Sequence, residues 1–365
     1  MHLEVDPVKT VAKPEPEDPT EKYLNRALQG WRSGIIQDHF EHQRNQADYN
    51  KHDDTDVFWA SKMYDSMAQM NHVGRFVRAK RFLDIGLVWS FAVSGYVTID
   101  ECDDTRCCPG GYATYVMRAC PDSTGMGISL PVSEGGHGPA IPPDLLPRIE
   151  LKMHDLMSYD LAPSKPKPYS LAGLSLSRVP FKPNSFDFVI CDGHYLRLSP
   201  DNDRRPWNWT RLLISQLLLG LRAVSSGGSM FIKLAHVERP LTARILLALC
   251  RIGNHVRTIK SQHIHVYRGS FYVSVQGVRT ESDEYDQLLK GLERLWYVMT
   301  FEGRDGYGRD ITWEEQDSVM PWTDVMSPHG IVTIRIVALE GDRGGPTAES
   351  GPRMWVAGED TVAMI

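Results

Sequence analysis

Two glycine-containing segments hold the first residues whose types and spacing could do chemistry. The run FLDIG is an apolar strand pattern that ends in Asp84 and Gly86, which puts a carboxylate at the strand's carboxyl end and lets the backbone turn close to a ligand. The run CCPGGYATYVM places the turn Pro109-Gly110-Gly111 before a helical pattern, so that backbone N–H groups can line a pocket for an anionic or polar ligand. Each segment alone is also typical of an ordinary turn.

The two segments form a more specific pattern when they are taken together. If Leu87–Arg106 is left out, the sequence becomes FLDIG-CCPGGYATYVM, with Tyr112 directly after the two glycines. This pattern resembles the D-x-G-x-x-P-G-G-aromatic loop with which the FtsJ-like (ribose 2′-O) methyltransferases hold S-adenosylmethionine. The resemblance continues to about residue 278, and it implies a doubly wound α/β fold and S-adenosyl-L-methionine as the cofactor.

The resemblance also implies which residues bind the cofactor. The run GMGISLP looks like the family's second strand, whose end, at Ser129, meets the cofactor ribose, and IELKMHDL looks like the third, with Asp155 placed to accept the adenine amino group. The run FDFVICDG looks like the fourth strand, with Asp192 at its carboxyl end, where open α/β sheets place their ligands. The expected cofactor-binding residues are Asp84, Gly86, Pro109, Gly110, Gly111, Tyr112, Ser129, Asp155 and Asp192.

Three residues match members of the family's Lys-Asp-Lys-Glu catalytic tetrad: Lys62 in FWASKMYD, Asp192, and Lys233 at the end of SMFIKL. A ribose hydroxyl is a poor nucleophile, so the reaction needs a nearby base and close alignment with the sulfonium methyl. Two ammonium groups that share a site make each other easier to deprotonate, and a carboxylate between them positions them. We expect Lys233 to accept or steer the hydroxyl proton, with Lys62 as the alternative.

Three features depart from the family's pattern. The tetrad's glutamate should fall in the last strand, where YRGSFYVSV has Ser270, or Gly269, and neither supplies a charge. Ser129 stands where an acid is common at the ribose, which predicts weaker cofactor binding. Leu87–Arg106 interrupts the cofactor loop with a mixture that suits neither a solvated loop nor a regular helix. We interpret this insert as translated non-coding sequence, with an active-site flap as the alternative.

Four cysteines gather near the cofactor loop: Cys102, Cys107, Cys108 and Cys120. A structural zinc site needs four well-spaced ligands, and this spacing fits no common zinc pattern. We therefore expect no metal.

An arginine pair stands close to two tryptophans in RRPWNW. Arg204 and Arg205 could neutralise an RNA strand while Trp207 and Trp209 stack on its bases. The alternative is the start of a helix that packs its tryptophans on the core.

The elements that must position these residues alternate between short apolar runs and helical patterns, which favours βαβ units around a mostly parallel sheet. The last strand follows its predecessor without a helix, which suggests an antiparallel finish. The predicted fold is therefore α/β: a Rossmann-like doubly wound methyltransferase sheet, mostly parallel with an antiparallel last strand, plus N- and C-terminal extensions. We expect strands at Arg81–Ile85, Met126–Leu130, Ile149–Met153, Phe186–Cys191, Ser229–Leu234, Val256–Ile259 and Phe271–Val275, and the clearest helices at Trp207–Val224, with its end at Ser226-Gly227-Gly228, and Leu241–Arg251.

Composition divides the chain into four parts. Residues 1–22 alternate proline with charged residues, which predicts a disordered tail. Residues 23–80 have a helical pattern, residues 81–278 form the expected methyltransferase domain with the insert 87–106, and residues 279–365 form an extension of unknown role. In that extension, ESDEYDQLLKGLERLWYVM predicts a helix and IVTIRIVAL looks like a strand.

Composition and charge bound the class of protein. The 42% of apolar and 24% of charged residues are ordinary globular values, which exclude a collagenous or wholly disordered chain. No apolar run reaches the ~18 residues of a membrane span, and the first residues lack a secretory pattern. Six cysteines in so long a chain suggest a reducing compartment. We expect an intracellular protein, in the cytoplasm or the nucleus, without a membrane partner.

The predicted function is methyl transfer from S-adenosylmethionine to an RNA ribose 2′-hydroxyl, with RNA as the partner. The net charge of −6 with 40 Lys and Arg means that RNA would have to meet a local basic face. The alternatives are a methyltransferase of a small molecule or protein, and a non-catalytic binding protein that keeps the fold. The oligomeric state stays open.

Overall fold

The computed structural model describes residues 56–86, 110–134, 140–168, 176–193, 205–237, 239–264, 269–304 and 306–340. Its centre is a seven-stranded sheet with the order β3-β2-β1-β4-β5-β7-β6. The pairs β1–β2, β2–β3, β1–β4 and β4–β5 are parallel, whereas β7 runs antiparallel to both β5 and β6. The predicted doubly wound sheet with an antiparallel last strand is confirmed.

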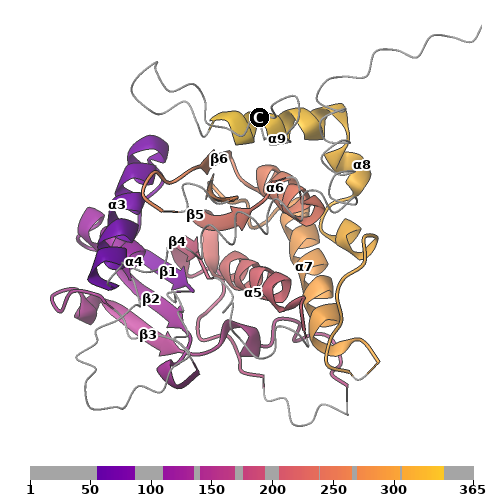
Figure 1. Ribbon diagram of the computed structural model, residues 1–365, viewed down its shortest axis with the longest axis horizontal. Helices are drawn as coiled ribbons and strands as arrows, with labels where there is room; N and C mark the ends of the chain where they lie inside the picture. The colour runs from indigo at the N-terminus through magenta and orange to yellow at the C-terminus, as the bar shows by residue number, and fades with distance from the viewer. Residues whose placement is uncertain are drawn as a thin grey trace, which may run out of the picture.

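The helices and strands follow one another in alternation along most of the chain (Figure 1). Their bounds are α3 Asp56–Gly74, β1 Arg81–Ile85, α4 Gly111–Ala119, β2 Thr124–Ser129, η2 Val132–Glu134, η3 Leu146–Arg148, β3 Ile149–Met153, η4 Leu156–Ser158, β4 Phe186–Cys191, α5 Asn208–Ala223, β5 Val224–Ala235, α6 Pro240–Ile252, β6 His255–Ile259, β7 Ser270–Gln276, α7 Asp283–Phe301, η6 Glu315–Ser318, α8 Trp322–Val325 and α9 Pro328–Glu340.

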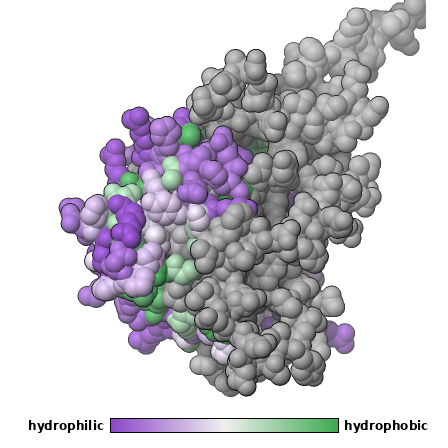
Figure 2. Space-filling model, turned by 60° about the vertical axis from the view of Figure 1, so that its left-hand side comes forward, coloured by the Kyte–Doolittle hydropathy of each residue, from purple (hydrophilic) through white to green (hydrophobic). Residues whose placement is uncertain are grey.

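Strand alternation gives the sheet two apolar faces. Because successive side chains of a strand point to opposite faces, Phe82 and Phe188 pack on one side with α3 and α4, while Leu83 and Val189 pack on the other with α5, α6 and α7. Figure 1 shows these two groups of helices on either side of the sheet. Seen from the side of α3, the described surface is mostly hydrophilic with smaller apolar areas (Figure 2).

Two sequence-based expectations about local structure are wrong. IVTIRIVAL forms α9 rather than a strand, because Ile331, Ile334 and Val337 recur at helical spacing and are buried together. The segment Ser226-Gly227-Gly228 lies within β5 rather than at a helix end. The helix α5 ends at Ala223, the next residue is already extended, and it pairs with β4.

The C-terminal part of the described chain belongs to the core. The predicted helix after residue 281 is confirmed as α7, and its residues Leu288, Leu292 and Trp296 share a cluster with α5 and the sheet. Among the described residues, no helix is long and apolar enough to cross a membrane. The predicted tail, residues 1–22, and the insert, residues 87–106, both lie outside the described residues.

Candidate functional site

Three predicted site residues stand where neighbouring strands end, on the face covered by α3 and α4. Asp84 pairs with Ile190 across β1 and β4, and Asp192 follows two positions later on the same face. On β5, Ile190 pairs with Phe231, and Lys233 follows two positions later. Asp84, Asp192 and Lys233 therefore converge at the carboxyl edge of the sheet, where open α/β folds bind their ligands.

Asp192 and Lys233 form a nearly buried ion pair. The Nζ of Lys233 lies 3.2 Å from Oδ1 of Asp192, and the two side chains are 12% and 9% exposed. Burial raises the pKa of Asp192, and the charge of Lys233 opposes that rise. A buried carboxylate keeps its charge only where such a partner and hydrogen bonds compensate for lost water. The predicted pairing of these two residues is thus present in the geometry.

Two tyrosines form a chain of hydrogen bonds that ends at this carboxylate. The hydroxyl of Tyr112, on α4, donates to the hydroxyl of Tyr272 at 2.8 Å, and Tyr272 donates to Asp192 Oδ1 at 3.3 Å. Burial and the charge of Asp192 hold the pKa of both tyrosines well above their usual range, so both stay protonated donors. The ring of Tyr272 stacks on Phe231 with centroids 4.8 Å apart, which fixes the hydroxyl in place.

Asp84 is fully enclosed behind this pair. Its carboxyl accepts a hydrogen bond from the backbone N–H of Ala113, in the first turn of α4. Burial, followed by the nearby charge of Asp192, raises the pKa of Asp84 to about 8, while the Ala113 bond opposes the rise. The structure gives Asp84 a role in joining β1 to the start of α4, and this carboxyl is largely protonated at neutral pH.

The glycine turns bring backbones unusually close together. Gly86 has φ +90°, and a Cβ there would overlap the backbone of Gly193, so the segments after β1 and β4 touch. Gly110 has φ +42° at the start of α4, and a Cβ on Gly111 would press on α3 at Ala60. Pro109, the insert and the adjacent cysteines lie outside the described residues.

The residues expected at the ribose and adenine lie one and two strands further along. Ser129 ends β2, is buried, and accepts the N–H of His154 at its carbonyl. Asp155 caps η4: its Oδ1 accepts from the N–H of Met157 at 2.9 Å and its Oδ2 from the hydroxyl of Ser158 at 3.2 Å. Asp155 therefore already has a structural role, and its role toward adenine stays a prediction.

Lys62 lies on α3, half-buried, in the turn that borders the start of α4. Its neighbour Met63 is one of the residues that a side chain at position 111 would meet. This places Lys62 on the helix that covers the site face, and its catalytic role stays a prediction.

The two candidates for the expected glutamate position differ in their surroundings. Ser270 pairs with Ala235, next to the Lys233–Tyr272 pair, and so lies on the same face as Lys233. A side chain at position 269 would overlap the ring of His236. The structure thus brings Ser270, rather than Gly269, toward the site.

Sequence reasoning missed Tyr272 and Lys260. An alternating strand such as SFYVSVQ predicts that Tyr272 is a core residue, and nothing in the sequence marks its hydroxyl as a partner of Asp192. Lys260 donates from Nζ to the carbonyl of Ser270 at 2.6 Å, and burial lowers its pKa to about 8. No sequence pattern marks this amine, because its burial depends on β7 folding back beside it.

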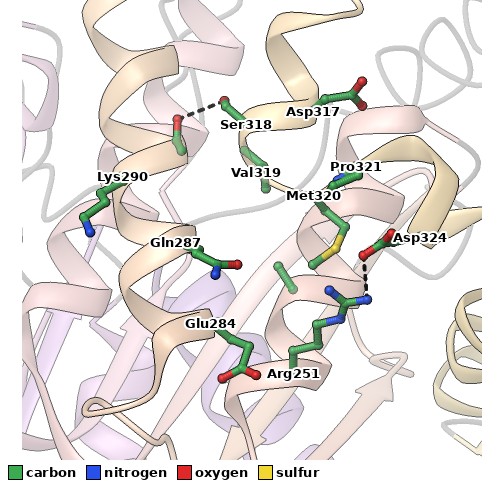
Figure 3. Close-up of a pocket in the computed structure, with 12 residues that line it drawn as sticks. Arg251, Glu284, Gln287, Lys290, Asp317, Ser318, Val319, Met320, Pro321 and Asp324 are labelled. Carbon is green, nitrogen blue, oxygen red and sulfur yellow. Dashed lines mark hydrogen bonds and ion pairs between the residues drawn. The ribbon is translucent and has the colours of Figure 1, made fainter.

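A cavity of about 410 Å³ lies apart from these residues, between α6, α7 and the segment from η6 to α8 (Figure 3). Its wall includes the Arg251–Asp324 ion pair at 2.8 Å and the exposed ends of Glu284 and Lys290. None of the predicted site residues lines it. Within the described residues there is also no group of three or more His, Cys, Asp or Glu that could hold a metal ion.

Comparisons with known proteins found similarity to solved structures, but none at the level of sequence families. No family model matches the sequence, and no curated protein matches it. A structure described as a ribosomal RNA methyltransferase from Plasmodium falciparum has 14% identity and a TM-score of 0.36, covering 59% of this chain and 96% of that one. Phosphoethanolamine N-methyltransferase 1 of Haemonchus contortus has 11% identity and a TM-score of 0.35, covering 70% of this chain and 54% of that one. At such values these similarities say nothing about substrate or mechanism.

Proposed function

We propose that this chain is an S-adenosylmethionine-dependent methyltransferase that acts on the ribose 2′-hydroxyl of RNA. The observation that supports the proposal most is the buried Asp192–Lys233 pair at the ends of adjacent strands, with Asp84 on the same face. The resemblance of the FLDIG and PGGY segments to the FtsJ-like cofactor loop supports the choice of cofactor, and the Lys-Asp-Lys pattern supports the choice of hydroxyl.

The charges of the described residues fit a cationic ligand. Asp84 and Asp192 are two buried carboxyl groups close enough for the charge of Asp192 to raise the pKa of Asp84, and Lys233 is paired with Asp192. A proton on Asp84 removes the repulsion between the two carboxyl groups, and a bound cation would offset it. S-adenosylmethionine carries a positive sulfonium, whereas its demethylated product does not.

The chain's own residues would handle the proton and position the groups around the ribose hydroxyl. S-adenosylmethionine supplies the electrophilic methyl group. A deprotonated Lys233 would take the proton that leaves the ribose hydroxyl as the ribose oxygen bonds to the methyl carbon and the methyl–sulfur bond breaks, leaving a neutral thioether. Asp192 holds the lysine in place and would stabilise the ammonium that forms. Tyr272 keeps the carboxylate of Asp192 oriented toward the lysine by donating its hydroxyl hydrogen.

The test separates binding from turnover. Isothermal titration with S-adenosylmethionine measures binding, and incorporation of labelled methyl groups into total RNA, followed by alkaline digestion, detects 2′-O-methylated and therefore alkali-resistant linkages. We expect Lys233→Ala to lower methyl transfer by at least about 100-fold with cofactor affinity within a few-fold, and Asp192→Ala to lower both. Lys290→Ala, on an exposed part of α7, is the matched control.

Three outcomes would count against the proposal. Normal transfer by Lys233→Ala overturns the ribose 2′-hydroxyl assignment. Labelling of small molecules or proteins in place of RNA makes the chain a methyltransferase of another class. Cofactor binding without any transfer makes it a binding protein, an outcome that the uncharged Ser270 in the glutamate position would explain.

A further inference from the structure

Two tryptophans in different environments stand at the start of α5, Trp207 at the N-cap and Trp209 in the first turn. Trp207 packs against the core and donates its indole N–H to the carbonyl of Met299 at 3.2 Å. Trp209 is 48% exposed, and the guanidinium of Arg239 lies 4.9 Å from its ring centroid. The sequence left two interpretations of these tryptophans, packing on the core and stacking on RNA. Trp207 packs on the core, and Trp209 faces solvent, where it is available for stacking.

A second exposed aromatic ring, from the segment after α7, lies against an arginine just before α5. The guanidinium of Arg205, just before α5, lies 5.6 Å from the ring centroid of Tyr307, which is 55% exposed. Single exposed apolar side chains are common on protein surfaces and need no explanation. Two exposed rings, each with an arginine against it, make a surface with a definite chemistry: flat π faces next to fixed positive charges.

This surface borders the candidate site. The helix α5 follows β4, which ends beside Asp192, and α6 follows β5, which carries Lys233 near its end. Both helices therefore begin at the carboxyl edge of the sheet. Arg239 is the N-cap residue of α6, so its contact with Trp209 joins the starts of the two helices.

We propose that Trp209 and Arg239, together with Arg205 and Tyr307, form a binding surface for unpaired RNA nucleotides next to the reacting ribose. The inference rests on the proposed function and extends it to the substrate's conformation. Bases stack on exposed aromatic rings only where they are free of their own helix, and the arginines neutralise the adjoining phosphates. The chain carries a net charge of −6, so RNA needs a local cationic surface of this kind.

The test uses the full chain and a short unstructured RNA that contains 2-aminopurine, whose fluorescence falls when the base stacks. Binding is followed by anisotropy, with the same sequence as a duplex for comparison. We expect Trp209→Ala to weaken single-strand binding about 5- to 150-fold and to remove the quenching, because stacking on one ring accounts for about that range. Trp209→Phe should restore most of both.

Charge is tested separately. Arg239→Ala should weaken binding and make its dependence on salt about one unit less steep. Arg118→Ala is the control. It removes an exposed arginine in the last turn of α4, which forms a surface pair with Asp144, and should leave affinity for RNA unchanged. Titration with S-adenosylmethionine on every variant shows whether the cofactor site is intact.

The outcomes distinguish this inference from the proposed function. Equal affinity of Trp209→Ala and wild type for the single strand overturns the surface, as does equal or tighter binding of the duplex, or no RNA binding by a chain that binds the cofactor. A chain that binds RNA through Trp209 but does not bind S-adenosylmethionine overturns the proposed function and leaves the surface standing.

Discussion

At the scale of single residues, the candidate site consists of charged groups that the fold has removed from water. Asp192 is compensated by Lys233 and Tyr272, whereas the carboxyl of Asp84 accepts the N–H of Ala113 and has a raised pKa. The positions of Asp84, Asp192 and Lys233 could be predicted from the sequence, because each stands near the carboxyl end of an apolar strand pattern or directly after it. Their burial could not, since it depends on α3, α4 and β7 closing over them.

Because the pKa of Asp84 is raised in the folded chain, we expect the stability of the fold to decrease as pH rises. In the unfolded chain this carboxyl loses its proton near pH 4, but in the folded chain it holds the proton up to about pH 8. Between these values the folded state binds more protons than the unfolded state, so the free energy of unfolding decreases with rising pH. Asp84→Asn removes this titration while keeping an acceptor for Ala113. We expect its melting temperature to exceed that of wild type near pH 9 and the difference to shrink toward pH 5.

The measurement is thermal unfolding of both chains across that pH range, where titrations common to both cancel in the difference. Asp144→Asn, at an exposed carboxylate, is the control and should give a curve parallel to that of wild type. Parallel curves for Asp84→Asn as well would show that Asp84 titrates normally in the folded chain.

At the scale of elements, the strands of the sheet were predicted better from the sequence than the helix ends and the C-terminal helix α9. All seven strands could be predicted because short apolar runs between turns have few other interpretations in an alternating α/β pattern. IVTIRIVAL misled because its β-branched residues favour a strand, while its position, beyond a sheet whose edge is already taken by β6, favours a helix that packs on β6 and α6. Local propensity was overridden by tertiary context.

The strand β7 carries the next prediction. Ser270 lies diagonally across from Lys233, on the same face, and its carbonyl binds the Nζ of Lys260. Diagonal neighbours of an antiparallel pair are about 7–8 Å apart, within reach of a long side chain. If the wild-type chain is a weak methyltransferase, Ser270→Glu should raise its initial rate of methyl transfer several-fold, because a carboxylate there rebuilds the charge balance around Lys233.

Ser270→Gln is the matched control, since it has the same length without the charge, and its rate should stay at the wild-type level. A glutamine variant as active as the glutamate variant would attribute the gain to size. A folded Ser270→Glu variant with unchanged activity would mean that this part of β7 does not take part in the reaction.

At the scale of the whole molecule, a buried cation helps to hold the segment after α7 against the core. Arg244 on α6 is 0% exposed, and its guanidinium lies 4.7 Å from the ring centroids of both Trp313 and Trp322. It also pairs with Asp317 at 2.6 Å and donates from Nε to the carbonyl of Met320 at 3.1 Å. The two tryptophans stand out in the sequence, but their partner does not. Arg244 is distant from them in the sequence and lies on a helix whose pattern is otherwise mostly apolar.

This arrangement predicts that residues 313–324 contribute to the stability of the whole domain. Arg244→Ala removes the contacts with two indoles, the hydrogen bond to Met320 and the pair with Asp317, whose side chain is 43% exposed. It should therefore lower the free energy of unfolding in urea by about 1–3 kcal/mol. Arg244→Lys should recover little, because an ammonium cannot stack between two indoles or hold both acceptors. Arg251→Ala, on the same helix, breaks the more exposed pair with Asp324 and should cost only about 0–1 kcal/mol. If the two alanine variants unfold at the same urea concentration, Arg244 does not anchor this segment. If Arg244→Ala instead unfolds in two steps, the segment is a separate unit whose docking depends on that arginine.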